Sequence, residues 1–265
     1  MPEYKKRSSV IRIITSSTFL IMIIANIMAN SLPINGMNTG QIADSYPNFF
    51  APAGYTFSIW GLIYLLLALH IIYDFGFFKG KSNSVNVRLI NKIGIPFSIS
   101  SVANAAWIIS WHYNQLFISL ILMFIILIML IRITNEINKR IMSPREVFFI
   151  RIPFGIYFGW ITVATIANVT IFLVSIGWRG FGIPEHIWAS IILITGMIIG
   201  VMILLKNQNI EYGLVLIWAY FGIYIKHTSA AGFSGKYMAV IYTVILCMVI
   251  FAITNVYVLF NKNKN

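Results

Sequence analysis

The chain has 265 residues, of which 59% are apolar and only 10% are charged. Soluble domains are about 25% charged, so this composition excludes a soluble globular fold. The formal net charge is +12, which in a soluble protein would suggest nucleic-acid binding. In a membrane protein the positions of the charges matter more. We therefore expect an all-α integral membrane protein that is embedded in the lipid bilayer and has no nucleic-acid partner.

A helix needs about 20 apolar residues to cross a bilayer, and the sequence predicts eight such spans. They cover residues 13–32, 55–73, 93–113, 115–131, 152–175, 187–205, 210–225 and 237–260. The turn at residues 112–115 divides an otherwise continuous apolar run, so the third and fourth spans should form a tight helical hairpin. The seventh span is the weakest, because it is short and begins beside Glu211.

Basic residues are concentrated on one side of the predicted membrane. The eight-span topology places 16 of the 19 Lys and Arg residues on the side of the N-terminus. The positive-inside rule makes this side cytoplasmic, with both termini there. A seven-span alternative, in which residues 210–225 are re-entrant, divides the charges in the same way. We favour eight spans, because a helix over residues 210–225 covers about 24 Å.

Few residues could carry acid–base or metal chemistry. His70 and Asp74 are four positions apart and can pair on one helix face, whereas His112, His186 and His227 lie at the ends of spans. The single cysteine, Cys247, is expected to be a buried thiol. We find no zinc-type Cys/His spacing and predict no metal site. An enzyme is therefore the weakest interpretation.

Aromatic and amide side chains form one stripe along each of three spans. The stripes comprise Phe57, Trp60 and Tyr64; Asn104, Trp107 and Trp111; and Pro153, Tyr157, Trp160, Ala164 and Asn168. Spacings of three and four residues place each set on one helix face. An unpaired amide facing lipid costs a few kcal/mol. Asn104 and Asn168 should therefore point inward, with the neighbouring rings.

Two simpler explanations compete with a ligand cavity. An interfacial aromatic belt accounts for Trp111, Trp178 and Trp188. It does not account for Trp160, which lies about 12 Å inside its span. Helix packing with amide hydrogen bonds explains the remaining stripes as well as a ligand cavity does, so the residue pattern alone leaves both open.

The second span is entered through the sequence PNFFAPAGYTFSIWGLIY at residues 47–64, which is Pro-rich and contains Phe-x-x-Trp. This motif resembles the entry to the second helix of the TspO/MBR family, the tryptophan-rich sensory proteins related to the mitochondrial translocator protein. Residues 104–107, NAAW, are similar to its Asn-x-x-Trp on the third helix. Residues 153–168, PFGIYFGWITVATIAN, are similar to its fifth-helix signature. The motifs occur in the family's order within residues 10–178.

The resemblance implies a five-helix bundle over residues 13–178, with a pocket that is covered by the first loop. Members bind porphyrins and hydrophobic drug-like molecules, and pocket Trp residues are implicated in light-dependent porphyrin breakdown. By motif position, the pocket would include Trp60, Tyr64, Asn104, Trp107, Trp160 and Ala164. With Phe57, Tyr157 and Asn168 from the stripes, nine ligand-binding residues are expected. The resemblance implies no required cofactor, and a tetrapyrrole is the candidate ligand.

The chain also departs from the family pattern. The paired prolines are reduced to Ala51-Pro52, and Phe49 or Phe50 replaces the preceding Trp. The fifth span ends without a Tyr shortly before Arg179, so the short cholesterol-type motif is absent. Residues 1–12 are expected to form a cytoplasmic N-terminus ahead of the bundle. Residues 187–260 form an additional three-helix segment after it, and residues 261–265 form a cytoplasmic tail. This segment could cap the bundle, change its function, or supply a homodimer face through the Gly-x-x-x-Gly motif at 196–200.

We therefore expect a multi-pass protein of a bacterial-type plasma membrane that acts as a receptor or sensor for a flat hydrophobic ligand. Ring stacking would hold the ligand, and buried amides would provide the few polar contacts. The alternative is a transporter or channel for small apolar or amphipathic solutes, in which the additional spans complete a pathway. Enzymatic activity would be at most a Trp-dependent photochemical reaction.

Overall fold

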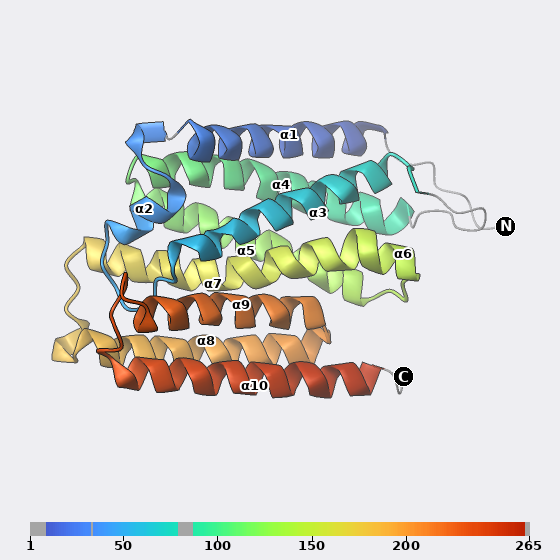
Figure 1. Ribbon diagram of the computed structural model, residues 1–265. Coiled ribbons are helices and arrows are strands. Elements are labelled where there is room, and N and C mark those ends of the chain that lie inside the picture. The colour runs from blue at the N-terminus through green and yellow to red at the C-terminus, as the bar shows by residue number, and fades with distance from the viewer. Residues whose placement is uncertain (1–8, 33, 79–86, 263–265) are drawn as a thin grey trace.

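A computed structural model describes residues 9–32, 34–78 and 87–262 of the chain. Within these ranges the secondary structure is helical and no strand occurs. The long helices lie side by side and alternate in direction, so that the start of α1 (Ser9–Ser31) and the end of α10 (Met238–Lys262) lie at the same end of the molecule (Figure 1). The predicted all-α fold is confirmed. We call the end where α1 starts the terminal end, and the opposite end the loop end.

Eight long helices make up most of the structure. They are α1 (Ser9–Ser31), α3 (Ile59–Asp74), α4 (Val87–His112), α5 (Leu116–Asn138), α7 (Ile152–Ser175), α8 (Glu185–Asn207), α9 (Ile210–Thr228) and α10 (Met238–Lys262). Two short helices, α2 (Thr39–Asp44) and α6 (Pro144–Glu146), lie at opposite ends of the bundle. The predicted hairpin is present, because α4 ends at His112 and α5 begins at Leu116.

Seven helical segments of the described chain are long and apolar enough to cross a membrane. Helix α9 is not among them, although it has 19 residues and runs antiparallel to its neighbours α8 and α10 (Figure 1). The chain is thus a multi-pass membrane protein, and the eight-span count stays a prediction. Lys5, Lys6, Arg7, Lys79, Lys81 and Lys264, which contribute to the predicted charge asymmetry, lie outside the described residues.

The first five long helices form a ring. Helix α4 packs against α1 and α5, α7 packs against α5 and α3, and a smaller contact between α1 and α3 closes the ring. The remaining three helices form a second unit, in which α10 packs against both α8 and α9. Helix α9 joins the two units by packing along α7. Helix α7 is therefore shared by the ring and the additional unit.

The contact between α7 and α9 requires a residue without a side chain. A Cβ atom at Gly159 would lie 2.9 Å from both the Tyr212 carbonyl oxygen and the Val215 Cβ atom. Close approach of this kind between membrane helices depends on small residues. Glycine at this position allows the backbones of α7 and α9 to pack closely.

The Gly-x-x-x-Gly motif in α8 is used within the chain. A Cβ atom at Gly196 would lie 2.7 Å from the Tyr220 hydroxyl, and one at Gly200 would lie 2.5 Å from a Leu216 methyl. Both glycines are buried. They accommodate side chains of α9, so a homodimer would have to use a different surface.

The membrane topology can be tested with single cysteines in a Cys247→Ala background. In the eight-span topology, Lys236→Cys lies outside the membrane on the same side as Arg179→Cys. Both should react in intact cells with a membrane-impermeant maleimide, whereas Lys139→Cys should react only after permeabilisation. If Lys236→Cys behaves like Lys139→Cys instead, α9 is re-entrant and the chain has seven spans.

Candidate functional site

Three helices, α3, α4 and α7, bring the predicted aromatic stripes together near the loop end of the ring. Trp60 lies at their centre, with its ring centroid 5.7 Å from that of Trp107, 6.1 Å from Tyr157 and 6.2 Å from Trp160. Its closest ring contact is with Tyr64, one turn further along α3, at 5.4 Å and an interplanar angle of 18°. Trp60 and Tyr64 thus form a stacked aromatic pair on α3.

A chain of buried hydrogen bonds connects α1, α4 and α7. The side-chain amide of Asn26 donates to the Oδ1 atom of Asn104 at 2.8 Å, and the Asn104 amide donates to the Tyr157 hydroxyl at 3.1 Å. All three side chains are buried. Because water and lipid offer these groups no partner inside the bundle, they must satisfy one another. This chain fixes which faces of the three helices point inward.

Asn168 forms a second polar centre closer to the loop end. Its Oδ1 atom accepts hydrogen bonds from the Trp107 indole nitrogen at 3.3 Å and from the Ser119 hydroxyl at 2.9 Å. Its amide donates to the Ala164 carbonyl oxygen of its own helix. Asn168 therefore links α4, α5 and α7. The prediction that both Asn104 and Asn168 point inward is confirmed.

A small cavity of about 40 Å³ lies among the Trp rings. Trp60, Trp107 and Trp160 line it, together with Ala164, Asn168 and residues of the loop that precedes α3. The indole nitrogen of Trp160 is buried and has no hydrogen-bond partner among the described residues. The volume is sufficient for water but far below the size of a drug-like ligand.

A much larger pocket, of about 650 Å³, lies between α1, α2 and α3. Its aromatic wall is formed by Phe57 and by the stacked pair of Trp60 and Tyr64. Its polar side chains come from α1 and from the segment around α2; they are Asn26, Asn30, Ser31, Asn38, Thr39, Gln41, Asp44 and Ser58. Phe57 and Trp60 line both this pocket and the small cavity.

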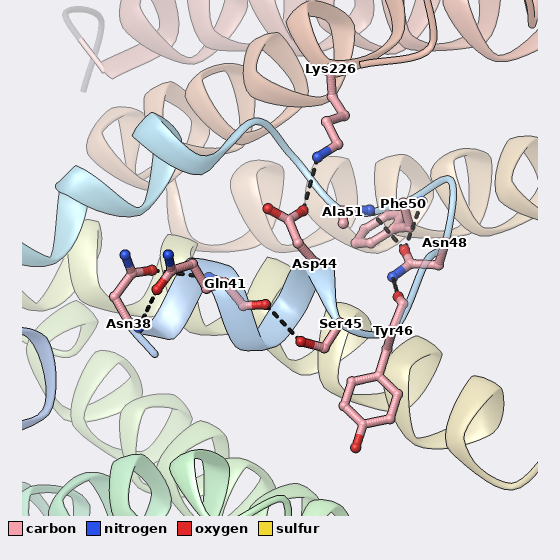
Figure 2. Close-up of polar contacts among 9 residues, drawn as sticks. All are labelled: Asn38, Gln41, Asp44, Ser45, Tyr46, Asn48, Phe50, Ala51 and Lys226. Carbon is pink, nitrogen blue, oxygen red and sulfur yellow. Dashed lines mark hydrogen bonds and ion pairs between the residues drawn. The ribbon is translucent and has the colours of Figure 1, made fainter. Parts of the chain in front are cut away.

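Residues 34–58, which we call the cover loop, close the loop end of the ring. The loop contains α2, which begins with a capping box. Gln41 N–H donates to the Asn38 side chain, and Asn38 N–H donates to the Gln41 side chain (Figure 2). Further along, the Asn48 side chain accepts from the backbone N–H groups of Phe50 and Ala51. These local bonds give an otherwise irregular segment a fixed shape.

One side of the cover loop is attached to the end of α4. The Trp111 indole donates to the Thr39 carbonyl oxygen at 3.2 Å, and His112 Nδ1 lies 3.0 Å from the Ile34 carbonyl oxygen. Because a carbonyl oxygen can only accept, His112 Nδ1 carries the proton. The belt position predicted for Trp111 is wrong: the side chain is buried and lines the small cavity, because its indole hydrogen bond draws it beneath the loop.

The other side of the cover loop is attached to α9. The Gly222 carbonyl oxygen accepts from Ala53 N–H at 3.0 Å, and Thr56 packs where a Cβ atom at Gly222 would lie. The Trp218 indole donates to the Thr56 carbonyl oxygen at 3.1 Å, and His227 Nε2 lies 2.9 Å from the Phe49 carbonyl oxygen. The additional helices therefore hold half of the cover loop in place.

The structure brings the nine predicted site residues into one region, but they do not all line the same cavity. Phe57, Trp60 and Tyr64 line the large pocket, and six of the nine line the small cavity: Phe57, Trp60, Trp107, Trp160, Ala164 and Asn168. Asn104 and Tyr157 line neither, because the hydrogen-bond chain occupies them.

Sequence reasoning missed the polar side of the large pocket. Asn26 and Asn30 are amides within the first span, spaced by one helical turn. The argument that was applied to Asn104 and Asn168 would have identified them. Thr39, Gln41 and Asp44 carry no comparable signal, since nothing in a loop sequence shows which side chains turn toward the bundle.

The fold and the site together define a multi-pass helical membrane protein with a pocket, aromatic on one part of its wall, beneath a structured loop. A sequence model of the family described as TSPO-like protein matches residues 12–257. The chain belongs to this TSPO-like family, and its membership indicates a membrane protein that binds hydrophobic ligands. The match extends through α8 and α9 and most of α10. No curated protein and no solved structure matches the chain.

The buried hydrogen-bond chain should contribute measurably to stability. Asn104→Leu would remove the hydrogen bond between Asn104 and the Tyr157 hydroxyl and one of the two hydrogen bonds of the Asn26 amide, which would keep only its bond to the Met22 carbonyl oxygen. A buried polar group that loses its partner costs about 1–3 kcal/mol. We expect a clearly lower midpoint of thermal unfolding in detergent. Val102→Leu, on a half-exposed position of the same helix, is the control and should leave the midpoint nearly unchanged. Equal midpoints for both variants would contradict a structural role for the chain.

Proposed function

We propose that this protein is a membrane receptor or sensor for a flat, apolar, tetrapyrrole-like ligand, which binds in the large pocket against Trp60 and Tyr64. The observation that carries the proposal is the shape of that pocket. Two nearly parallel rings form the aromatic part of its wall, and amide, hydroxyl and carboxylate side chains from α1 and the cover loop, which we call the polar rim, line much of the rest. Flat conjugated ligands gain both apolar burial and favourable ring stacking on such a face.

The volumes of the two cavities support this placement. Ligand pockets generally measure about 300–1,000 Å³, and the large pocket, at about 650 Å³, falls within this range. The cavity among the Trp rings measures only about 40 Å³. Trp60 borders both spaces, so a ligand on its outer face is also close to the remaining Trp rings.

The polar rim offers hydrogen-bond donors. The capping box of α2 uses the side-chain oxygen atoms of Asn38 and Gln41 as acceptors. Their NH₂ groups are left to donate to acceptors on a ligand. A few polar contacts in a mainly apolar pocket are typical of small-molecule sites, where they set the orientation of the ligand.

The origin of the lining residues supports a binding site rather than a pathway through the additional helices. Both cavities are lined by residues of the ring and the cover loop, and the lining residues include none from α8, α9 or α10. The additional unit contacts the loop instead, through Trp218 and His227. Its effect on the walls of the pocket is therefore indirect, through the position of the loop.

The test is a titration of purified protein with protoporphyrin IX, followed by the change in porphyrin absorbance. Trp60→Leu removes the centre of the aromatic face. We expect about tenfold weaker binding, which corresponds to about 1.4 kcal/mol and to the value of one good ring contact. Trp178→Leu, beyond the end of α7, is the control and should bind like the unmodified protein.

Two results would contradict the proposal. One is the absence of saturable porphyrin binding by the unmodified protein. The other is an affinity that does not change in Trp60→Leu, which would place the ligand away from the aromatic face. Folding of each variant is checked by its thermal unfolding midpoint without ligand.

A further inference from the structure

The large pocket has one formally charged residue among the residues that line it. This residue is Asp44, in the last turn of α2. The other polar lining groups are amides and hydroxyls. A carboxylate at the rim of an apolar pocket would repel an anionic ligand and favour a cationic one, unless its charge is balanced.

The balancing charge comes from the additional helices. The Nζ atom of Lys226, in the last turn of α9, lies 2.9 Å from the Oδ1 atom of Asp44. Figure 2 shows the lysine side chain extending from its helix to the carboxylate of α2, with Gln41 on the same short helix and Asn38 at its N-cap. The ion pair therefore connects the rim of the pocket to a helix that does not line it.

The two partners differ in their access to water. The side chain of Asp44 is 48% exposed and that of Lys226 is 23% exposed. A carboxylate with this exposure can turn into water at little cost, whereas the more enclosed ammonium group loses more when it has no anion beside it. Exposed ion pairs are worth only about 0.2–1 kcal/mol. Another anion can therefore readily replace Asp44 beside the Lys226 ammonium group.

We propose that Lys226 binds an anionic group at the edge of the ligand, and that this group takes the place of Asp44. The ligand is then a flat apolar molecule with a peripheral carboxylate. Its rings lie against Trp60 and Tyr64, its carboxylate accepts hydrogen bonds from the Lys226 ammonium, and Asp44 turns into water. This inference rests on the function proposed above and adds the charge of the ligand and a residue that selects for it.

The other basic residues at the loop end are placed differently. Arg179 lines a separate crevice of about 80 Å³ between α7 and α8. Lys236 lies over the ring of Tyr237, 5.7 Å from its centroid. Among the residues that the structure describes, Lys226 is the basic residue that contacts the rim of the large pocket.

A comparison of two porphyrins measures the effect of the ligand's charge separately from the effect of its rings. Protoporphyrin IX carries two carboxylates, and its dimethyl ester has the same rings without the charges. We expect Lys226→Met to bind the diacid about three- to fivefold more weakly, as follows from the loss of one partly exposed ion pair. The affinity for the diester should stay within twofold. Lys226→Arg should retain the affinity for the diacid, since it keeps the charge.

Asp44→Asn provides the reciprocal variant, because it removes the competing carboxylate. It should bind the diacid more tightly than the unmodified protein, again by about three- to fivefold, and should leave the diester unchanged. Lys236→Met is the matched control, since it removes a charge at the same end of the molecule but not beside the pocket. Both ligands should bind this control normally.

The outcomes distinguish the inference from the proposed function. If the unmodified protein binds the diester but Lys226→Met and Asp44→Asn leave the affinity for the diacid unchanged, the ligand anion does not reach Lys226 and the inference is overturned. The same holds if Lys226→Met weakens both porphyrins equally, because the lysine then acts only through the position of the cover loop. If the unmodified protein binds neither porphyrin, the proposed function fails and the inference fails with it.

Discussion

The hydrogen-bond chain from Asn26 through Asn104 to Tyr157 is the interaction on which the rest of the site depends. Inside a membrane bundle, a polar group that loses its partner finds no replacement in the lipid. This requirement fixes the rotation of α1, α4 and α7 about their axes. Trp107 follows Asn104 by three residues and Trp160 follows Tyr157 by three, so both rings are directed to the interior. The aromatic cluster is thus positioned by amide chemistry as well as by apolar packing.

The cover loop depends on both parts of the molecule. Its first half is held by Trp111 and His112 at the end of α4, and its second half is held by Trp218, Gly222 and His227 of α9. The additional helices thereby affect the pocket without lining it. Helix α7 makes this possible, because one of its faces carries Tyr157 and Trp160 while Gly159 allows α9 to pack closely against another.

The fold was largely predictable for a simple reason. Helices that cross a bilayer must be long and apolar, and the basic residues that flank them lie mainly on one side. Each span can therefore be recognised in the sequence without knowledge of the helices that pack against it. Helix α9 is the exception: its first turn contains Glu211 and its last turn contains Lys226 and His227, and these charged and polar residues lower its mean hydropathy. Trp111 was misplaced because an indole near the end of a span has the same sequence context in an interfacial belt and beneath a loop.

By itself, the sequence determined that this is a helical membrane protein, which residues form the inward stripes, and which family the motifs resemble. The first two properties follow from local periodicity and from the cost of exposing an amide to lipid, and the resemblance follows from the residues of the three motifs. Only the tertiary structure decided that the space beside the stripes is divided into a small cavity and a large pocket, and that Asp44 meets Lys226 across 182 positions of the chain. Such features depend on how the loop lies against the helices and on the residual space between packed side chains, neither of which is encoded in the periodicity of any single segment.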